Sequence, residues 1–290
     1  MKIVITGVSG NVGRAVAANL ANKGHELKLL VRDNRKLPAT LKGVGEVLEG
    51  DHLDAQWVRR AVSGADALFW MTPMAMTNDI AAYNHKASEA ANAAAREARR
   101  VVALSGAYCD QAGLGLASWI RFLEFAIEAG AANVRHLRAG LFMENFLFQK
   151  ALITTEGIIT QPVPAEARVR FVATSDIGRA AAQLLEDTTW SGHGAVGIHG
   201  PERLSFAEAA AQLGRTLGRE VRFVESTGAD MEAALVATGA PAEFARNYVE
   251  MYLGFARLFQ ANQDPKDPTL IGSTTLASYC QSTLGPALQA

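Results

Sequence analysis

The chain opens with a strand, a glycine turn and a helix, and this unit constrains the fold more than any other feature. Residues 3–7 form a short apolar run, and Gly7, Gly10 and Gly13 follow at three-residue spacing. A helical pattern comes next, and a second apolar run covers 27–31. Such a turn lets the backbone approach a pyrophosphate, and the helix N-terminus supplies free amides and a positive dipole end. The unit therefore predicts dinucleotide binding, with a ligand-free glycine turn as the alternative.

Strands and helices alternate through the first half of the chain. Apolar runs at 65–71, 101–105 and 134–139 predict buried strands, and helical patterns at 78–99 and 116–129 lie between them. This alternation is typical of βαβ units and a parallel sheet. Right-handed crossovers then give an α/β fold with a Rossmann-type doubly wound sheet.

The regular alternation fades past the middle of the chain, although no repeat or flexible linker marks a boundary. We expect an NAD(P)-binding Rossmann domain over residues 1–150 and a smaller α+β C-terminal substrate lobe over 151–290. A lobe that partly re-enters the first domain, through about 171–200, fits the pattern better than two separate domains.

Local signals predict several elements in this second half. A helical pattern covers 144–155, and 161–164 is typical of a turn or loop. The run 171–173 predicts a short strand, after which Ser175 or Asp176 can open a helix.

Composition limits the class of protein. The chain has 290 residues, of which 49% are hydrophobic and 20% charged, as in ordinary soluble domains. A net charge of -1 argues against nucleic acid or anionic membrane as a partner. Cys109 and Cys280 are far apart and form no metal-ligand pattern. We therefore expect no metal site. The chain begins directly with a strand and has no bilayer-length apolar run, so we expect a cytoplasmic protein.

The residues after the second strand distinguish the two nicotinamide cofactors. An acidic side chain there binds the ribose 2′-OH of NAD, whereas an arginine pairs with the 2′-phosphate of NADP. This chain has Arg32, Asp33, Arg35 and Lys36. Because Arg32 comes first, NADP(H) is the preferred cofactor, and NAD(H) bound through Asp33 is the alternative.

Ligands of an open parallel sheet lie at the carboxyl ends of its strands. We expect Asp51 and His52, after the third strand, on the adenine side. Together with the glycine turn and the ends of the next strands, the expected cofactor contacts are Gly7, Ser9, Gly10, Asn11, Val12, Arg32, Asp51, His52, Met71, Thr72, Pro73, Ser105 and Gly106.

Reductases of this build often use a Tyr-x-x-x-Lys pair, in which the lysine lowers the tyrosine pKa and the phenol transfers a proton. None of the five tyrosines has a lysine four residues later. A substrate should therefore accept hydride without strong acid assistance, as quinones, activated enones, imines and cationic dyes do.

Candidate substrate contacts follow the fifth and sixth strands. Tyr108 could donate a hydrogen bond to a substrate oxygen as the catalytic residue, or wall the pocket. Phe142, Met143 and Phe146 suit a surface that stacks on an aromatic acceptor, with plain core as the alternative. Asn145 could hold the substrate or the nicotinamide, or cap a helix. A later helical stripe is typical of core or a lobe interface, with a substrate wall as the alternative: Phe244, Tyr248, Met251, Tyr252, Phe255 and Phe259.

Several segments resemble the NmrA-like group of atypical short-chain dehydrogenases/reductases over nearly the whole chain, and most closely its NAD(P)H:quinone oxidoreductases and triphenylmethane-dye or azo reductases. The chain departs from this group at Ala139, where a proline is common, and at Ile120, where many members carry lysine or histidine. The matching segments are 5–13, 31–33, 50–51, 104–108, Glu124, 137–146, 176–178, 199–202 and 270–273.

The resemblance implies an NADP(H) cleft between a Rossmann domain and a small lobe, and hydride transfer to flat conjugated substrates. The expected activity is that of an NADPH-dependent reductase of a conjugated small molecule. One alternative is a non-catalytic NAD(P)-sensing regulator, and another is a biosynthetic ketone or imine reductase. A homodimer is compatible with each of these.

Overall fold

A computed structural model describes residues 1–261 and 267–289. Its centre is an eight-stranded sheet in the order β12-β9-β6-β5-β4-β1-β2-β3, in which every neighbouring pair is parallel. This order confirms the predicted Rossmann-type sheet. The strands are β1 Lys2–Ile5, β2 Glu26–Val31, β3 Glu46–Glu49, β4 Ala67–Trp70, β5 Val101–Gly106, β6 Val134–Ala139, β9 His193–His199 and β12 Thr269–Ile271.

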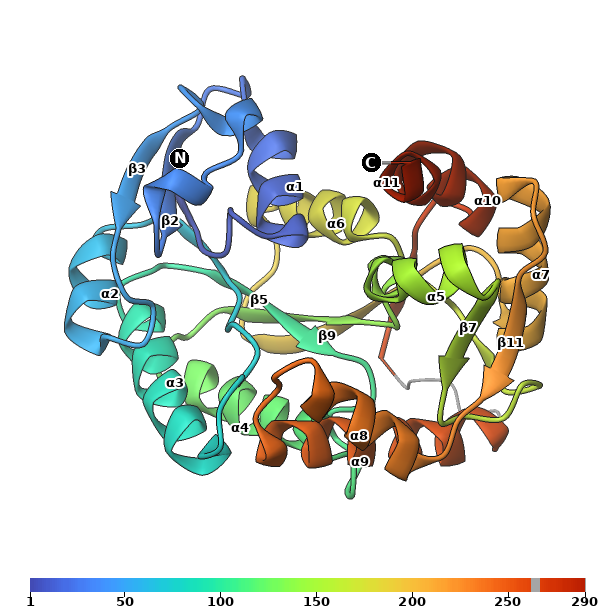
Figure 1. Cartoon of the computed structure of the whole chain (residues 1–290). Helices are drawn as coiled ribbons and strands as arrows, with labels where there is room; N and C mark the ends of the chain where they lie inside the picture. The colour runs from blue at the N-terminus through green and yellow to red at the C-terminus, as the bar shows by residue number, and fades with distance from the viewer. Residues whose placement is uncertain (262–266, 290) are drawn as a thin grey trace.

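Helices cover both faces of this sheet (Figure 1). One face carries α1 (Asn11–Leu20) and α6 (Thr174–Glu186), and the other carries α2 (Ala55–Val62), α3 (Ile80–Ala95) and α4 (Leu116–Glu128). The first pair is tightly packed, because a Cβ on Gly178 would lie 2.4 Å from the Cβ of Ala15. The sheet therefore has an apolar core on each side.

The remaining elements form a smaller lobe with its own core (Figure 1). Two short sheets build it: one pairs β7 (Ile158–Gln161) with β11 (Arg222–Glu225) in parallel, and the other pairs β8 (Arg168–Val169) with β10 (Leu204–Ser205) in antiparallel. Its helices are α5 Lys150–Thr155, α7 Phe206–Leu217, α8 Gly228–Ala237, α9 Ala242–Gln260, α10 Leu276–Tyr279 and α11 Gly285–Gln289.

The chain passes between sheet and lobe more than once. After β8 it returns to the large sheet as α6 and β9, enters the lobe again, and comes back as the edge strand β12. Asp176 in α6 anchors this last return, since its Oδ2 accepts the backbone N–H of Thr274 at 2.9 Å.

Several local predictions are wrong. Gln161 ends strand β7 instead of starting a loop. The helical pattern over 144–155 is confirmed, as a 3₁₀ helix over residues 143–149 that continues into α5. Residues 171–173 make only an isolated bridge between Val172 and Phe142. Neither Ser175 nor Asp176 caps α6; Glu144 from the preceding segment accepts the Thr174 N–H and hydroxyl instead.

No helix among the described residues is long and apolar enough to cross a bilayer. Nor does that part of the chain group three or more His, Cys, Asp or Glu side chains in a way that could hold a metal ion.

Candidate active site

The glycine turn joins β1 to α1 with geometry suited to a diphosphate. Gly7 has a φ of +68°, and its carbonyl accepts the Gly10 N–H at 2.9 Å. A Cβ on Gly13 would lie 2.4 Å from the carbonyl carbon of Gly7, so this position in the first turn of α1 requires glycine. A Cβ on Gly10 would meet nothing in the described chain closer than 3.4 Å, which leaves space above the turn.

The N-terminus of α1 keeps its amides available. No side chain in the described chain caps it, and its first turn holds no acidic residue. Asn11 and Val12 lie in this first turn and Ser9 just before it, and their contact with the cofactor stays a prediction. Uncapped amides at a helix N-terminus bind anions such as a pyrophosphate.

Arg32 and Asp33 differ in how much of each side chain is free. Both Asp33 oxygens accept hydrogen bonds from the Arg35 side chain, at 2.9 and 3.0 Å, which lower the pKa of this carboxyl. Arg32 is exposed and forms no hydrogen bond or ion pair within the described residues. The residue that would bind the ribose of NAD is therefore occupied, and the residue that would pair with the 2′-phosphate of NADP is free.

His52 lies beside Arg32 in a buried position after β3. Its ring stacks on Trp57 with centroids 5.8 Å apart, and neither ring nitrogen has a hydrogen-bond partner in the described chain. Burial and the nearby Arg32 charge lower the pKa of His52 to about 4, so the ring is neutral. Gly50 makes this stack fit, because a Cβ there would lie 2.1 Å from the Trp57 ring. The exposed Asp51 instead accepts the Leu53 N–H. These buried, unpartnered ring nitrogens suit the polar edge of an adenine.

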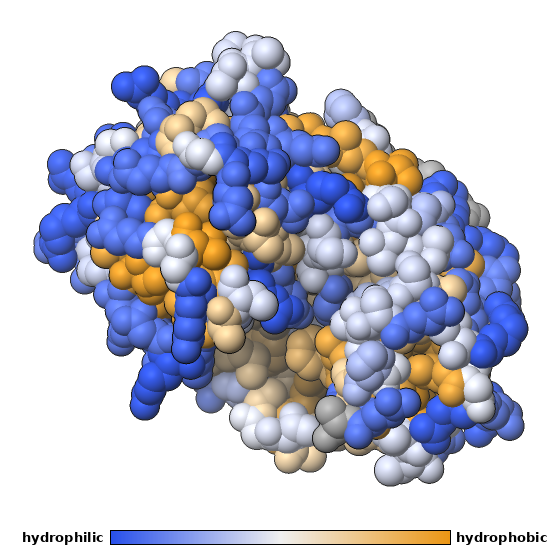
Figure 2. Space-filling view, turned by 90° about the horizontal axis from the view of Figure 1, so that it is seen from above, coloured by the Kyte–Doolittle hydropathy of each residue, from blue (hydrophilic) through white to orange (hydrophobic). Residues whose placement is uncertain are grey.

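A cavity of about 620 Å³ opens beyond the carboxyl ends of β4, β5 and β6. Figure 2 shows the surface hollowed between the two parts of the molecule, with apolar residues inside and hydrophilic ones around. The structure brings together here the following predicted residues: Met71, Thr72, Pro73, Ser105, Gly106, Tyr108, Phe142 and Asn145.

Met143 and Phe146, predicted as substrate contacts, do not line the cavity. They are 1% and 4% exposed and pack in the core of the lobe. The reason is the 3₁₀ helix, in which residues three apart share a face. Phe142 and Asn145 therefore face the cavity, while Met143 and Phe146 face the core.

Tyr108 follows the carboxyl end of β5 and has a φ of +65°. It is one of two non-glycine residues with a positive φ in the described chain. A side chain held in this strained region is frequent at functional sites. Its ring contacts Phe255 and Phe259 of α9, at centroid distances of 6.3 and 6.2 Å. Helix α9 thus supplies a cavity wall, formed by Tyr248, Met251, Tyr252, Phe255 and Phe259 but not by Phe244.

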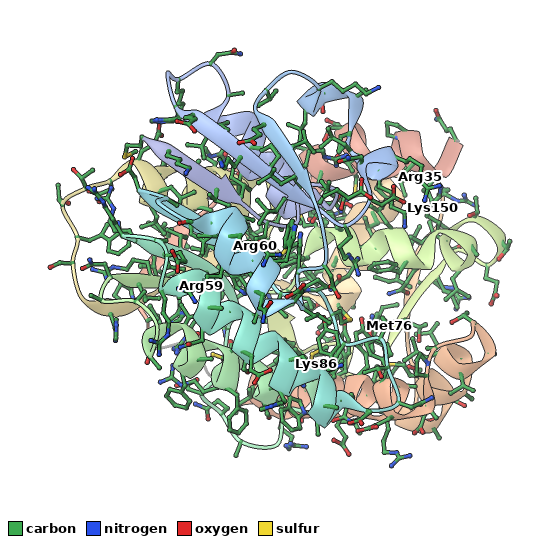
Figure 3. The ribbon with its side chains drawn as sticks, turned by 90° about the vertical axis from the view of Figure 1, so that its left-hand side faces the viewer. Arg35, Arg59, Arg60, Met76, Lys86 and Lys150 are labelled. Carbon is green, nitrogen blue, oxygen red and sulfur yellow. The ribbon has the colours of Figure 1, made fainter. Side chains whose placement is uncertain are left out.

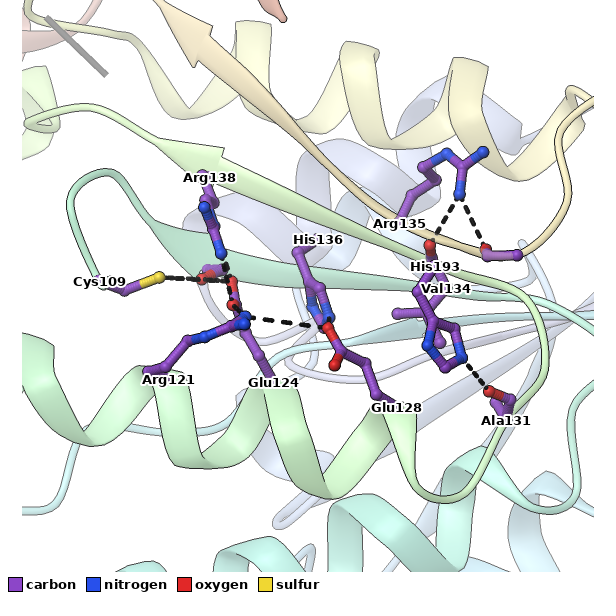
Figure 4. Close-up of polar contacts among 12 residues, drawn as sticks. Cys109, Arg121, Glu124, Glu128, Ala131, Val134, Arg135, His136, Arg138 and His193 are labelled. Carbon is purple, nitrogen blue, oxygen red and sulfur yellow. Dashed lines mark hydrogen bonds and ion pairs between the residues drawn. The ribbon is translucent and has the colours of Figure 1, made fainter. Parts of the chain in front are cut away.

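Behind Ser105 lies a buried charged network (Figure 4). Glu124, 2% exposed, accepts the Ser105 hydroxyl at 2.6 Å and two Arg138 nitrogens at 3.0 and 2.8 Å. Arg138 also pairs with Asp267 at 3.1 Å, and Arg121 contacts Glu124 from the same helix. Burial alone would raise the pKa of Glu124, but the Arg138 hydrogen bonds and the other partners lower it to about 2. The network fixes the end of β5 against β6.

Other cavity residues were missed at the sequence level. The Tyr83 hydroxyl donates to the Pro73 carbonyl at 2.8 Å, and both residues line the cavity. Figure 3 marks Met76 in the loop between β4 and α3, the loop to which Pro73 belongs. Arg168 and Arg170 line the far end. Val169 between them lines the cavity too, and two arginines within three residues were the available signal. Trp119, His199 and Arg203 also line the cavity.

Comparison with known proteins agrees with this geometry. Residues 7–188 match the model of a family described as NAD(P)H-binding. The chain belongs to this NAD(P)H-binding family. It is 32% identical over 243 residues to a (4-alkanoyl-5-oxo-2,5-dihydrofuran-3-yl)methyl phosphate reductase of Streptomyces griseus, covering 82% of both chains.

Two solved structures share the fold. The NADPH complex of the Escherichia coli quinone oxidoreductase QOR2 has a TM-score of 0.77 at 22% identity, covering 97% and 99% of the two chains. The negative transcriptional regulator NmrA in complex with NAD has 0.74 at 17%, covering 99% and 97%. The family match and the reductase relative bear out the expected NAD(P)H-dependent oxidoreductase, and the two solved structures bear out the expected fold.

Proposed function

We propose that this protein transfers hydride from NADPH to a conjugated small molecule, and that an activated enone or a quinone is its acceptor. The observation that carries the proposal is the cavity beside Ser105 and Gly106, whose walls are mainly apolar and aromatic. Such walls suit a flat acceptor and exclude water from the reacting atoms. The Streptomyces relative supports the enone, because its printed substrate name contains an unsaturated ring that carries an alkanoyl group.

The residues that would hold the cofactor are the amides of α1, Arg32 and His52. When bound there, NADPH supplies the hydride. Ser105 and Gly106 then lie at the reacting end, and the hydrogen bond from Ser105 to Glu124 holds this edge of the sheet in place. Catalysis rests mainly on the position of the acceptor relative to the nicotinamide.

Proton transfer has a smaller role in this proposal. We assign Tyr108 as the hydrogen-bond donor to the acceptor oxygen. Tyr83 is unsuited to the task, because burial raises its pKa to about 12 and its hydroxyl is committed to the Pro73 carbonyl. Burial also raises the pKa of Cys109 to about 12, which keeps its thiol protonated.

The electrons and atoms of the reaction balance without another reactant. Hydride forms a C–H bond at the β-carbon of the enone, and the C=C electron pair moves onto the carbonyl oxygen as an enolate. A hydrogen bond from Tyr108 stabilises that oxygen, and a proton from water then completes the saturated ketone.

The test is to mix the purified protein with NADPH and follow its absorbance with an alkanoyl butenolide, a benzoquinone, an azo dye, a cyclic imine and a simple saturated ketone. We expect the conjugated acceptors to react. The saturated ketone should react more slowly by about 10² or more, because its reduction needs a general acid and the protein has no Tyr-x-x-x-Lys pair to supply one. Fast reduction of the ketone or imine alone would favour the biosynthetic reductase. Tight NADPH binding with no oxidation would favour the sensing regulator and refute the proposal.

A further inference from the structure

One end of the cavity is cationic, and nothing in the proposed chemistry uses it. Arg168, Arg170, Arg203 and His199 line this end. Across the part of the chain that the structure describes, no aspartate or glutamate lines the cavity at all. A pocket with apolar walls and clustered guanidinium groups is suited to a ligand that has an apolar body and an anionic end.

Strand β8 and the segment after β9 build this end and hold Arg170 in place. A Cβ on Gly200 would lie 1.8 Å from the Phe171 carbonyl oxygen, so the two segments are in direct contact. Arg170 donates from Nη1 to the Pro201 carbonyl at 2.8 Å. Its guanidinium is therefore oriented before any ligand binds, which lowers the entropic cost of binding.

The positive charge of Arg170 is not compensated. Arg168 pairs with Glu208 at 2.6 Å, so much of its charge is balanced at the rim. For Arg170 the only polar contact among the described residues is the neutral Pro201 carbonyl. A partly buried guanidinium with no counter-ion is stabilised when an oxyanion binds to it.

The phosphates of the cofactor do not supply this anion. A Cβ on Gly140 would lie 3.1 Å from the Arg170 carbonyl oxygen, which places Arg170 just beyond β6. Strand β1, which leads into the diphosphate turn, is three strands away, and β2 with Arg32 is four away. At about 4.8 Å for each strand, these separations are about 14 and 19 Å.

We propose that Arg170, assisted by Arg168 and Arg203, binds an oxyanion substituent of the acceptor, such as a phosphate ester. This inference rests on the proposed function, because it assigns the anion to the molecule that receives hydride. The printed substrate name of the Streptomyces relative includes a phosphate, which is consistent with this chemistry. The acceptor therefore lies with its conjugated part beside Ser105 and its anion beside β8.

The experiment compares two probes that differ only in a phosphate group: an alkanoyl butenolide with a hydroxymethyl group, and its phosphate ester. Calorimetry gives the affinity of each for NADP⁺-saturated protein, and NADPH oxidation gives kcat/KM. We expect the phosphate ester to bind about tenfold tighter, the effect of one charge-assisted hydrogen-bond pair. Arg170→Gln should remove this preference, because the variant no longer pairs with the anion.

Two variants control the interpretation. Arg215→Gln removes the same charge from an exposed site on α7 and should keep the preference. Arg170→Lys keeps the positive charge but lacks the planar guanidinium that can bind two oxygens at once. This variant should therefore keep part of the preference for the phosphate ester, and it tests the inference even if Arg170→Gln does not fold. Equal binding of the two probes, no binding of either, or equal loss of both in Arg170→Gln overturns the inference. A preference for phosphate without NADPH oxidation refutes the proposed function alone.

Discussion

Replacing Glu124 with glutamine should destabilise the whole protein, because this carboxylate is the centre of the buried network. It accepts hydrogen bonds from Ser105 and from two nitrogens of Arg138. A glutamine keeps one acceptor oxygen and turns an NH₂ group toward a guanidinium. Among the described residues, Arg138 would then keep Asp267 as its one acidic partner.

The size of the effect follows from the pKa of Glu124. Its pKa falls from 4.5 to about 2 in the folded protein. At 1.36 kcal/mol for each pKa unit, this difference corresponds to ~3 kcal/mol of folding free energy. Breaking a buried ion pair at one partner generally costs about 3–5 kcal/mol, which agrees. We therefore expect Tm to fall by about 6 °C or more.

Urea denaturation at neutral pH measures this loss, with Glu97→Gln as the matched control. Glu97 pairs with Arg59 at 3.0 Å on the surface, where that pair should contribute less than about 1 kcal/mol. A Glu124→Gln variant whose unfolding free energy is within about 1 kcal/mol of the parent's, which is about the error of the method, would refute this expectation.

The difference in unfolding free energy between the parent and Glu124→Gln should decrease as the pH falls. Because the folded pKa of Glu124 is lowered, its contribution is complete above about pH 4.5 and is lost as the pH falls toward 2. The gap in unfolding free energy between parent and Glu124→Gln should therefore narrow over this window. A gap that stays constant on acidification would contradict the assignment.

Three further substitutions test the cofactor and substrate sites. Arg32→Ala should weaken NADPH binding by about tenfold in calorimetry and leave NADH unchanged, whereas Arg60→Ala on α2 (Figure 3) should affect neither. Gly13→Ala should lower stability by about 1–3 kcal/mol in urea denaturation, because its Cβ would strike the Gly7 backbone, but Gly10→Ala should lose only cofactor affinity. Tyr108→Phe should lower kcat/KM by about tenfold; a loss of about 10³ would instead make it the general acid.

Much of the fold could be predicted because its signals are local. The Gly7–Gly13 turn and the apolar runs of β4, β5 and β6 depend on short stretches of sequence. The edge strand β12 gave no such signal, because its residues are exposed and its existence depends on pairing with β9. Glu144 capping of α6 joins positions 30 residues apart, which no local rule can find.

The candidate site was predicted unevenly for the same reason. Residues at strand ends were found, because topology alone places Ser105 and Met71 at the cleft. Met143 and Phe146 were misplaced, because a 3₁₀ helix and an α-helix turn different residues toward the cavity. Arg168 belongs to a two-residue strand and Arg170 follows it, so this segment is too short to be recognised from its sequence pattern.

The return of the chain to β12 has a consequence for synthesis on the ribosome. The last strand of the large sheet, and the Asp267 that balances Arg138, come from the final 24 residues of the chain. During synthesis, the nucleotide-binding half leaves the ribosome before these residues do. The sheet is therefore incomplete until β12 has been made. Removal of residues 267–271 should therefore destabilise the nucleotide-binding half, because β9 would lose its neighbour and Arg138 would lose its ion pair with Asp267.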